Sequence, residues 1–278
     1  MLPLISTIST PQPQPVNQMY VFGDSLSDTG VAYRLSGGSY PPSPPYYRGR
    51  FSNGPVWVED LAEALQLPSA QVSNFACGGA TTSASGAFPP GLLAQVQAFV
   101  QTRAAQASPT VEPDALYVLW AGANDYFQGV SSASGPVDNI RSAIAALAQA
   151  GAKRILVANL PDLGQLPSTR SGSQSAALNA LSEAHNRGLR QSLKVLLQEY
   201  SDLALATLDV NALYRQAASN PAQFGLSNVL TACFAGVQGC RQPDQYLFWD
   251  DIHPTAAAHR ILGQAAYHAV QAVGMVPT

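Results

Sequence analysis

The chain has 278 residues, of which 46% are hydrophobic and 11% are charged, and its net charge is −3. This composition is typical of a folded protein with a large core and excludes an intrinsically disordered chain. The 14 lysines and arginines form no basic patch, so nucleic acid is not an expected partner. No apolar run is long enough for a membrane-spanning helix, so stable membrane insertion is not expected.

A single α/β domain commonly reaches this length, and we expect one domain at residues 19–278. Residues 1–18 contain no lysine or arginine, and their apolar part is too short for an intact signal peptide. The alternating prolines and glutamines at 11–15 predict an extended or flexible leader, such as the remnant of a trimmed signal.

Apolar runs alternate with segments of helical periodicity along the chain. We expect strands at 19–23, 71–75, 114–121, 154–159 and 203–208, and helices at 55–67, 92–107, 137–150, 175–200, 210–218 and 255–273. The segments 29–54 and 219–247 are dense in chain breakers and are expected to be irregular. The tyrosines and prolines of 29–54 either line a substrate cleft or belong to a connection without a role. The sequence leaves open whether 36–50 and 219–247 move as lids. The alternation predicts a three-layer αβα domain with a doubly wound, mainly parallel five-stranded sheet.

The first three expected strands end in small polar or glycine-rich turns. Ser25 follows the first strand, Gly78 and Gly79 follow the second, and Asn124 follows the third. The carboxyl ends of parallel strands are where ligands bind in open α/β sheets, so these residues predict a site at one sheet edge. Each could also be a turn residue or a helix cap.

A serine becomes a nucleophile when a histidine held by a carboxylate removes its proton. His253 precedes Pro254, which disfavours helical geometry and places the histidine in a loop ahead of a helix. Asp250 lies three residues earlier and can reach the imidazole, whereas Asp251 is interpreted as a structural or N-terminal helix charge. The remaining histidines lie within expected helices and are interpreted as packing or surface residues: His185, His259 and His268.

Acyl transfer also needs hydrogen-bond donors for the oxyanion of the tetrahedral intermediate. The backbone N–H groups of Ser25 and Gly79 and the side-chain amide of Asn124 are the candidates, with Gly78 as an alternative to Gly79. Asp24 is expected to hold the turn that presents Ser25. The serine lies in a Gly-x-Ser-x-Ser context, which disfavours the α/β-hydrolase elbow.

Four blocks in this order resemble the GDSL (SGNH) family of lipases and esterases. They are Gly23-Asp24-Ser25-Leu26, Asn74-Phe75-Ala76-Cys77-Gly78-Gly79-Ala80-Thr81, Gly122-Ala123-Asn124-Asp125 and Asp250-Asp251-Ile252-His253-Pro254, and the stretch 49–57 resembles the Arg-Phe-Ser-Asn-Gly segment of the lipase-type branch. The resemblance covers nearly the whole chain. It implies a flavodoxin-like SGNH-hydrolase fold, Ser25 as nucleophile and His253 as base, with Asp250 three residues before it. It also implies Gly79 and Asn124 as oxyanion donors. Val31 departs from the asparagine often found after Asp-x-Gly in this branch, which concerns loop contacts and no catalytic role.

We therefore expect a serine ester hydrolase that acts on a small-molecule or lipid ester and needs no metal or organic cofactor. A surface of low charge and aromatic loops favour an apolar acyl chain over a charged polysaccharide. Lysophospholipase or acyltransferase activity would use the same residues. A non-catalytic binding protein on this fold is the alternative of another class, and labelling of Ser25 by a fluorophosphonate separates the two. The sequence carries no indication of oligomeric state.

The chain has three cysteines. Cys233 and Cys240 bracket a six-residue loop that a disulfide can close, and Cys77 stands alone. A Cys233–Cys240 bridge implies an oxidising compartment, so we expect a secreted or periplasmic protein; three reduced thiols in a cytoplasmic enzyme are the alternative. Neither the cysteine nor the histidine spacing resembles a zinc site.

Overall fold

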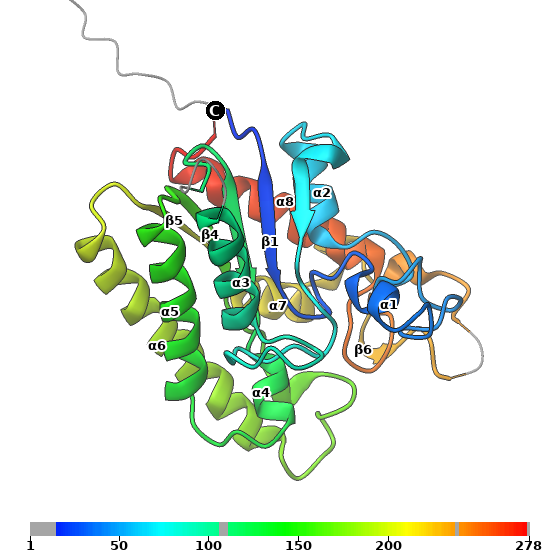
Figure 1. Ribbon diagram of the computed structural model, residues 1–278. Coiled ribbons are helices and arrows are strands. Elements are labelled where there is room, and N and C mark those ends of the chain that lie inside the picture. Colours follow the sequence, from blue (N-terminus) through cyan, green and yellow to red (C-terminus); the bar gives the residue numbers. More distant parts are fainter. Residues whose placement is uncertain (1–14, 106–110, 237–238, 277–278) are drawn as a thin grey trace, which may run out of the picture.

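The computed structural model describes residues 15–105, 111–236 and 239–276. Five parallel strands form one sheet in the order β2-β1-β3-β4-β5 (Figure 1). The strands are β1 Met19–Gly23, β2 Val72–Asn74, β3 Leu116–Trp120, β4 Arg154–Ala158 and β5 Ala204–Leu208. All five expected strands are present, so the predicted doubly wound α/β fold is confirmed.

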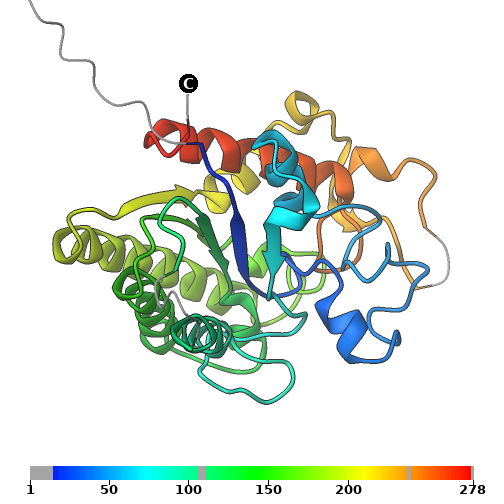
Figure 2. The same cartoon turned by 45° about the horizontal axis from the view of Figure 1, so that its top comes forward.

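Helices cover both faces of this sheet (Figure 2). They are α2 Trp57–Ala64, α7 Val210–Ser219 and α8 Ala256–Ala272 on one face, and α3 Leu92–Ala104, α5 Ser134–Gln149 and α6 Ser175–Glu199 on the other. Successive side chains of a strand point to opposite faces, so each strand contributes to two cores. In β1, Met19 and Val21 pack with α2 and α8, while Tyr20 and Phe22 pack with α3 and α5. Burial on both faces explains why β1, β3 and most of β4 are continuous apolar runs, whereas the edge strands β2 and β5 are only partly buried.

The prediction that 29–54 is irregular throughout is wrong, because it contains helix α1, Val31–Leu35. The Asp28 carboxylate starts this helix by accepting hydrogen bonds from the N–H groups of Gly30, Val31 and Ala32. A further short helix that was not expected, α4 Ala123–Phe127, follows β3 directly. Both helices depend on local side-chain and turn contacts rather than on apolar periodicity.

The segment 219–247 is also more regular than expected. It contains β6 Asn228–Ala232 and most of β7 Tyr246–Phe248, which pair in a separate two-stranded sheet. The two strands are separated along the chain, so composition alone could not reveal that they pair. Short 3₁₀ helices complete the described elements: η1 Ser69–Gln71, η2 Leu163–Gln165, η3 Pro221–Phe224 and η4 Pro243–Gln245.

The ends and the cysteines complete the fold. Residues 1–14 of the expected leader lie outside the described residues, whereas Val16 is buried and the Gln18 carbonyl accepts from the Leu116 N–H at 2.9 Å. The packed chain therefore includes the last residues of the expected leader.

Cys233 and Cys240 form a disulfide, the pairing favoured from the sequence, and Cys77 is buried and unbridged. Among the described residues, no helix combines the length and apolar character needed to cross a bilayer.

Candidate active site

The predicted site residues meet at the carboxyl ends of the two central strands. Ser25 lies two residues after β1, and Asn124 lies at the start of α4, just after β3. The strand order reverses between β1 and β3, which is the place where crevices form in open α/β sheets. A cavity of about 130 Å³ opens there, lined by Ser25, Gly79, Asn124 and His253 among others.

Ser25, His253 and Asp250 form one hydrogen-bonded chain. The Oγ atom of Ser25 lies 2.9 Å from Nε2 of His253, and Nδ1 of His253 lies 2.7 Å from Oδ2 of Asp250. The carboxylate accepts the Nδ1 proton, which leaves Nε2 able to accept a proton from the serine hydroxyl. The arrangement can therefore activate the serine as a nucleophile.

Asp250 is held from several sides. Its Oδ1 atom accepts the backbone N–H groups of Ile252 and His253 at 2.8 and 2.6 Å, and its Oδ2 atom accepts the Tyr46 hydroxyl at 2.7 Å. Burial by itself would raise the pKa of Asp250, but the neighbouring His253 ring and these hydrogen bonds outweigh it and lower the pKa to about 2. The carboxylate is thus ionised at any pH where the histidine can serve as a base.

The two glycines of the second block have different environments. The Gly78 N–H donates to Oδ2 of Asp28 at 2.8 Å, whereas Gly79, with φ of +84°, lines the cavity at Ser25. The side-chain amide of Asn124 donates one N–H to the Ala80 carbonyl at 2.9 Å, and an amide has a second hydrogen to offer. This geometry favours Gly79 over Gly78 as an oxyanion donor.

Asp24 takes no part in the Ser25–His253–Asp250 chain of hydrogen bonds. Its Oδ1 atom accepts the Leu26 N–H at 3.0 Å and so holds the turn at Ser25, as expected. The side chain is almost wholly buried, and burial raises its pKa to about 7, with the Leu26 hydrogen bond opposing the rise. The Asp251 side chain is exposed five residues before α8, and the Asp251 backbone carbonyl accepts the Ser168 N–H at 3.0 Å.

The other histidines lie in helices, as expected. His185 is buried in α6 with Nδ1 2.8 Å from the Tyr126 hydroxyl, and His259 is buried in α8 and accepts the Trp57 N–H. Burial lowers the pKa of His185 to about 4 and that of His259 to about 3, so both rings are neutral. His268 is exposed on α8.

The Arg-Phe-Ser-Asn-Gly segment supports the loop that carries His253, a role that the sequence did not reveal. The Ser52 hydroxyl donates to the Pro254 carbonyl at 2.8 Å, and Oδ1 of Asn53 accepts the Ala256 N–H at 2.8 Å. The Phe51 ring lies 5.2 Å from the His253 ring between centroids. These contacts fix both the backbone and the ring of the histidine.

Phe51 also explains why Gly78, in the second block, is a glycine. A Cβ atom at Gly78 would lie 2.2 Å from the Phe51 ring. No larger residue fits there without displacing the ring that packs on His253.

Three buried polar side chains tie the strand ends together, and sequence reasoning missed all of them. Asp28 joins α1 to Gly78, as described above. Asp125 accepts both the N–H and the hydroxyl of Thr82, at 2.9 and 2.7 Å. Gln95 of α3 exchanges two hydrogen bonds with the backbone of Gly23, each 2.9 Å long. Their effect is to hold the turns of the site rigidly, which is what preorganised catalysis requires.

The described residues contain no group of three or more histidine, cysteine or acidic side chains that could hold a metal ion.

The chain matches the family model for GDSL-like lipases and acylhydrolases over residues 19–266. The protein belongs to this family.

Curated relatives agree with this assignment. The chain is 31% identical to a phosphatidylcholine-sterol acyltransferase of Aeromonas hydrophila, covering 90% of this chain and 89% of that one. It is 26% identical to the GDSL esterase/lipase APG of Arabidopsis thaliana, covering 95% of each. Some relatives are longer, and the chain spans 49% and 63% of two of them.

Among solved structures, the native aryl esterase of M. smegmatis superposes with a TM-score of 0.53 at 16% identity, covering 93% of this chain and 100% of that one. At this identity the likeness concerns the fold. Together with the family, it confirms the predicted SGNH-hydrolase architecture and the predicted class: this GDSL protein is a carboxylic ester hydrolase.

Proposed function

We propose that this GDSL hydrolase cleaves carboxylic esters through an acyl-enzyme on Ser25, with His253 as the base and Asp250 as the group that orients it. The observation that carries the proposal is the continuous hydrogen-bonded chain from Ser25 through His253 to an ionised Asp250 at the wall of the cavity. Without His253, or without the Asp250 carboxylate that orients it, the serine hydroxyl has no acceptor positioned to take its proton.

In this mechanism Ser25 Oγ attacks the ester carbonyl while its proton passes to Nε2 of His253. The negative charge that develops on the carbonyl oxygen is met by the N–H groups of Ser25 and Gly79 and by the amide of Asn124. His253 then gives the proton to the leaving alcohol. A water molecule activated by the same histidine releases the acid and restores Ser25.

The acyl group can also pass to an alcohol other than water, because the acyl-enzyme is the same. The Aeromonas hydrophila relative is named as an acyltransferase, so transfer is the second candidate. Adding a sterol or a long-chain alcohol to the reaction separates the two. Hydrolysis yields free acid throughout, whereas a transferase diverts most of the acyl group into a new ester.

Labelling by a fluorophosphonate tests the nucleophile directly. We expect one label on Ser25 in the folded protein, and we expect Ser25→Ala to abolish both labelling and hydrolysis of p-nitrophenyl acetate. Ser131→Ala, at an exposed serine away from the cavity, is the matched control and should behave as the parent protein does. A folded Ser25→Ala variant that still hydrolyses the ester would disprove the assignment.

We also propose that the protein works in an oxidising compartment, either outside the cell or in the periplasm. The support is the disulfide between Cys233 and Cys240, since such bridges persist mainly outside the reducing cytoplasm. Mass spectrometry of protein taken from its natural compartment tests this, because reduction must add two hydrogens. Protein that is already reduced there would refute it.

A further inference from the structure

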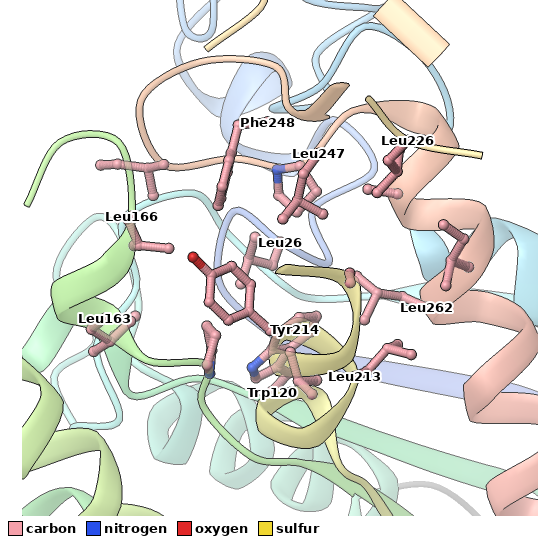
Figure 3. A pocket seen from close by; sticks show the side chains of 18 of the residues that line it. Leu26, Trp120, Leu163, Leu166, Leu213, Tyr214, Leu226, Leu247, Phe248 and Leu262 are labelled. Carbon is pink, nitrogen blue, oxygen red and sulfur yellow. The ribbon is translucent and has the colours of Figure 1, made fainter. Parts of the chain in front are cut away.

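A second cavity lies directly beside the one at Ser25 (Figure 3). It is lined by residues of α7, α8, β7 and the end of β3, and in Figure 3 the labelled side chains of Leu26 and Tyr214 lie between Leu163 on one side and Leu262 on the other. Four residues line both cavities: Leu26, Ala123, Phe127 and Ile252. The apolar cavity therefore begins at the residue next to the serine nucleophile.

We propose that this cavity receives the acyl chain of the ester and selects straight chains of medium length. The inference rests on the proposed role of Ser25, because the carbonyl that Ser25 attacks must lie at the junction of the two cavities. The alcohol part of the ester then remains in the more polar cavity, near Tyr40 and Asn124.

The chemistry of the walls points to hydrocarbon rather than water or a polar group. Among the residues that the structure describes, no charged side chain lines the cavity. The Tyr214 hydroxyl donates to the Gln165 carbonyl at 3.0 Å, and the indole N–H of Trp120 has no acceptor among the described residues. A buried water needs two to four polar partners, and apolar cavities without them stay dry and bind apolar molecules. A charged or hydroxylated acyl group would lose its hydration there without replacement.

The size of the cavity sets the length of the chain. About 80 Å³ of it is open to the centres of water-sized groups. This is several times the space that one water-sized group needs, so the cavity has room for several methylene groups in a row. With the carbonyl carbon and its neighbour at the junction, we expect the optimum to lie among chains of medium length, such as octanoate. Each additional methylene group of the acyl chain that the cavity buries should raise kcat/KM about fourfold.

Ala217 provides the test, because it lines the apolar cavity from α7 and not the cavity at Ser25. Ala217→Leu adds three carbon atoms to the space. We expect the ratio of kcat/KM for p-nitrophenyl octanoate to that for the acetate to fall roughly 50-fold, which corresponds to the loss of three buried methylenes. Ala218→Leu is the matched control, because it makes the same change one residue later, where the side chain is exposed. Its ratio should equal that of the parent protein.

The outcomes distinguish the two proposals. If Ser25→Ala abolishes acetate hydrolysis but Ala217→Leu leaves the ratio unchanged, the acyl cavity is wrong and the role of Ser25 stands. A parent protein whose kcat/KM falls steadily from acetate to octanoate also overturns the cavity. If Ala217→Leu does not fold, Leu213→Ala decides, since enlarging the same cavity should move the optimum to chains about two carbons longer; an unmoved optimum overturns the inference.

Discussion

Replacing the buried carboxyl beside the nucleophile should change how stability depends on pH. Asp24 is 2% exposed, and burial raises its pKa from 3.8 to about 7. Between these values the folded protein holds a proton that the unfolded chain has released, so the free energy of unfolding falls as the pH rises. At about 1.4 kcal/mol for each pH unit, ionised Asp24 destabilises the folded state by about 4 kcal/mol above pH 7.

Asp24→Asn removes this dependence while keeping the shape of the side chain. The asparagine oxygen can still accept the Leu26 N–H, and its new NH₂ group costs the same free energy at every pH. We therefore expect the free energy of unfolding of the variant, relative to the parent protein, to increase by about 4 kcal/mol from about pH 4 to about pH 8. The quantity to measure is this increase with pH, because the pH-independent cost of the asparagine NH₂ group cancels when two pH values are compared.

Urea denaturation of both proteins across this pH range measures the effect. Asp138→Asn, at an exposed carboxylate on α5, is the matched control, and its curve should run parallel to that of the parent protein. A curve for Asp24→Asn that also runs parallel to the parent protein would refute the reasoning, because it would mean that Asp24 is ionised in the folded state at low pH.

Three further changes test the site and the disulfide. Tyr46→Phe removes one hydrogen bond to the Asp250 carboxylate, an interaction of about 1.5–3 kcal/mol. We therefore expect kcat to fall about tenfold or more with KM unchanged. An unchanged kcat would contradict a positioning role for Tyr46. Asn124→Ala should lower kcat about 10²–10³-fold in the same ester assay, as loss of an oxyanion donor does elsewhere, and a loss confined to KM would exclude that role. Replacing both Cys233 and Cys240 by serine should lower the free energy of unfolding by about 2–3 kcal/mol in urea, since the bridge restricts a short loop in the unfolded chain. Equal stability would mean that removing the bridge frees the loop as much in the folded protein as in the unfolded chain.

The inner strands of the sheet, β1, β3 and β4, were predictable because they are buried on both faces. Burial demands continuous apolar runs such as 116–120, and each run ends where polar turns must begin. The contact between His253 and Asp250 was predictable from local sequence, because Pro254 disfavours a helix at His253 and a spacing of three residues brings Asp250 to the ring.

The parts that were missed depend on contacts between distant positions. Tyr46 lies in a stretch with other tyrosines, and only its contact with Asp250, 204 positions away, distinguishes it. The pairing of β6 with β7 and the apolar cavity likewise arise from the packing of separate elements. Helix α1 was hidden by its glycine- and proline-rich surroundings, because its start depends on the Asp28 carboxylate rather than on helix propensity.

The long separation between Ser25 and His253, 228 positions along the chain, affects when activity arises during synthesis. Helix α2, near the start of the domain, packs against α8 at its end, so the histidine loop is fixed only after the last helix has docked. Contacts between segments so far apart in the chain form slowly, because the long loop that joins them must close first. A chain interrupted before Asp250 contains Ser25 but lacks both Asp250 and His253, so it cannot form the hydrogen-bonded chain of the site.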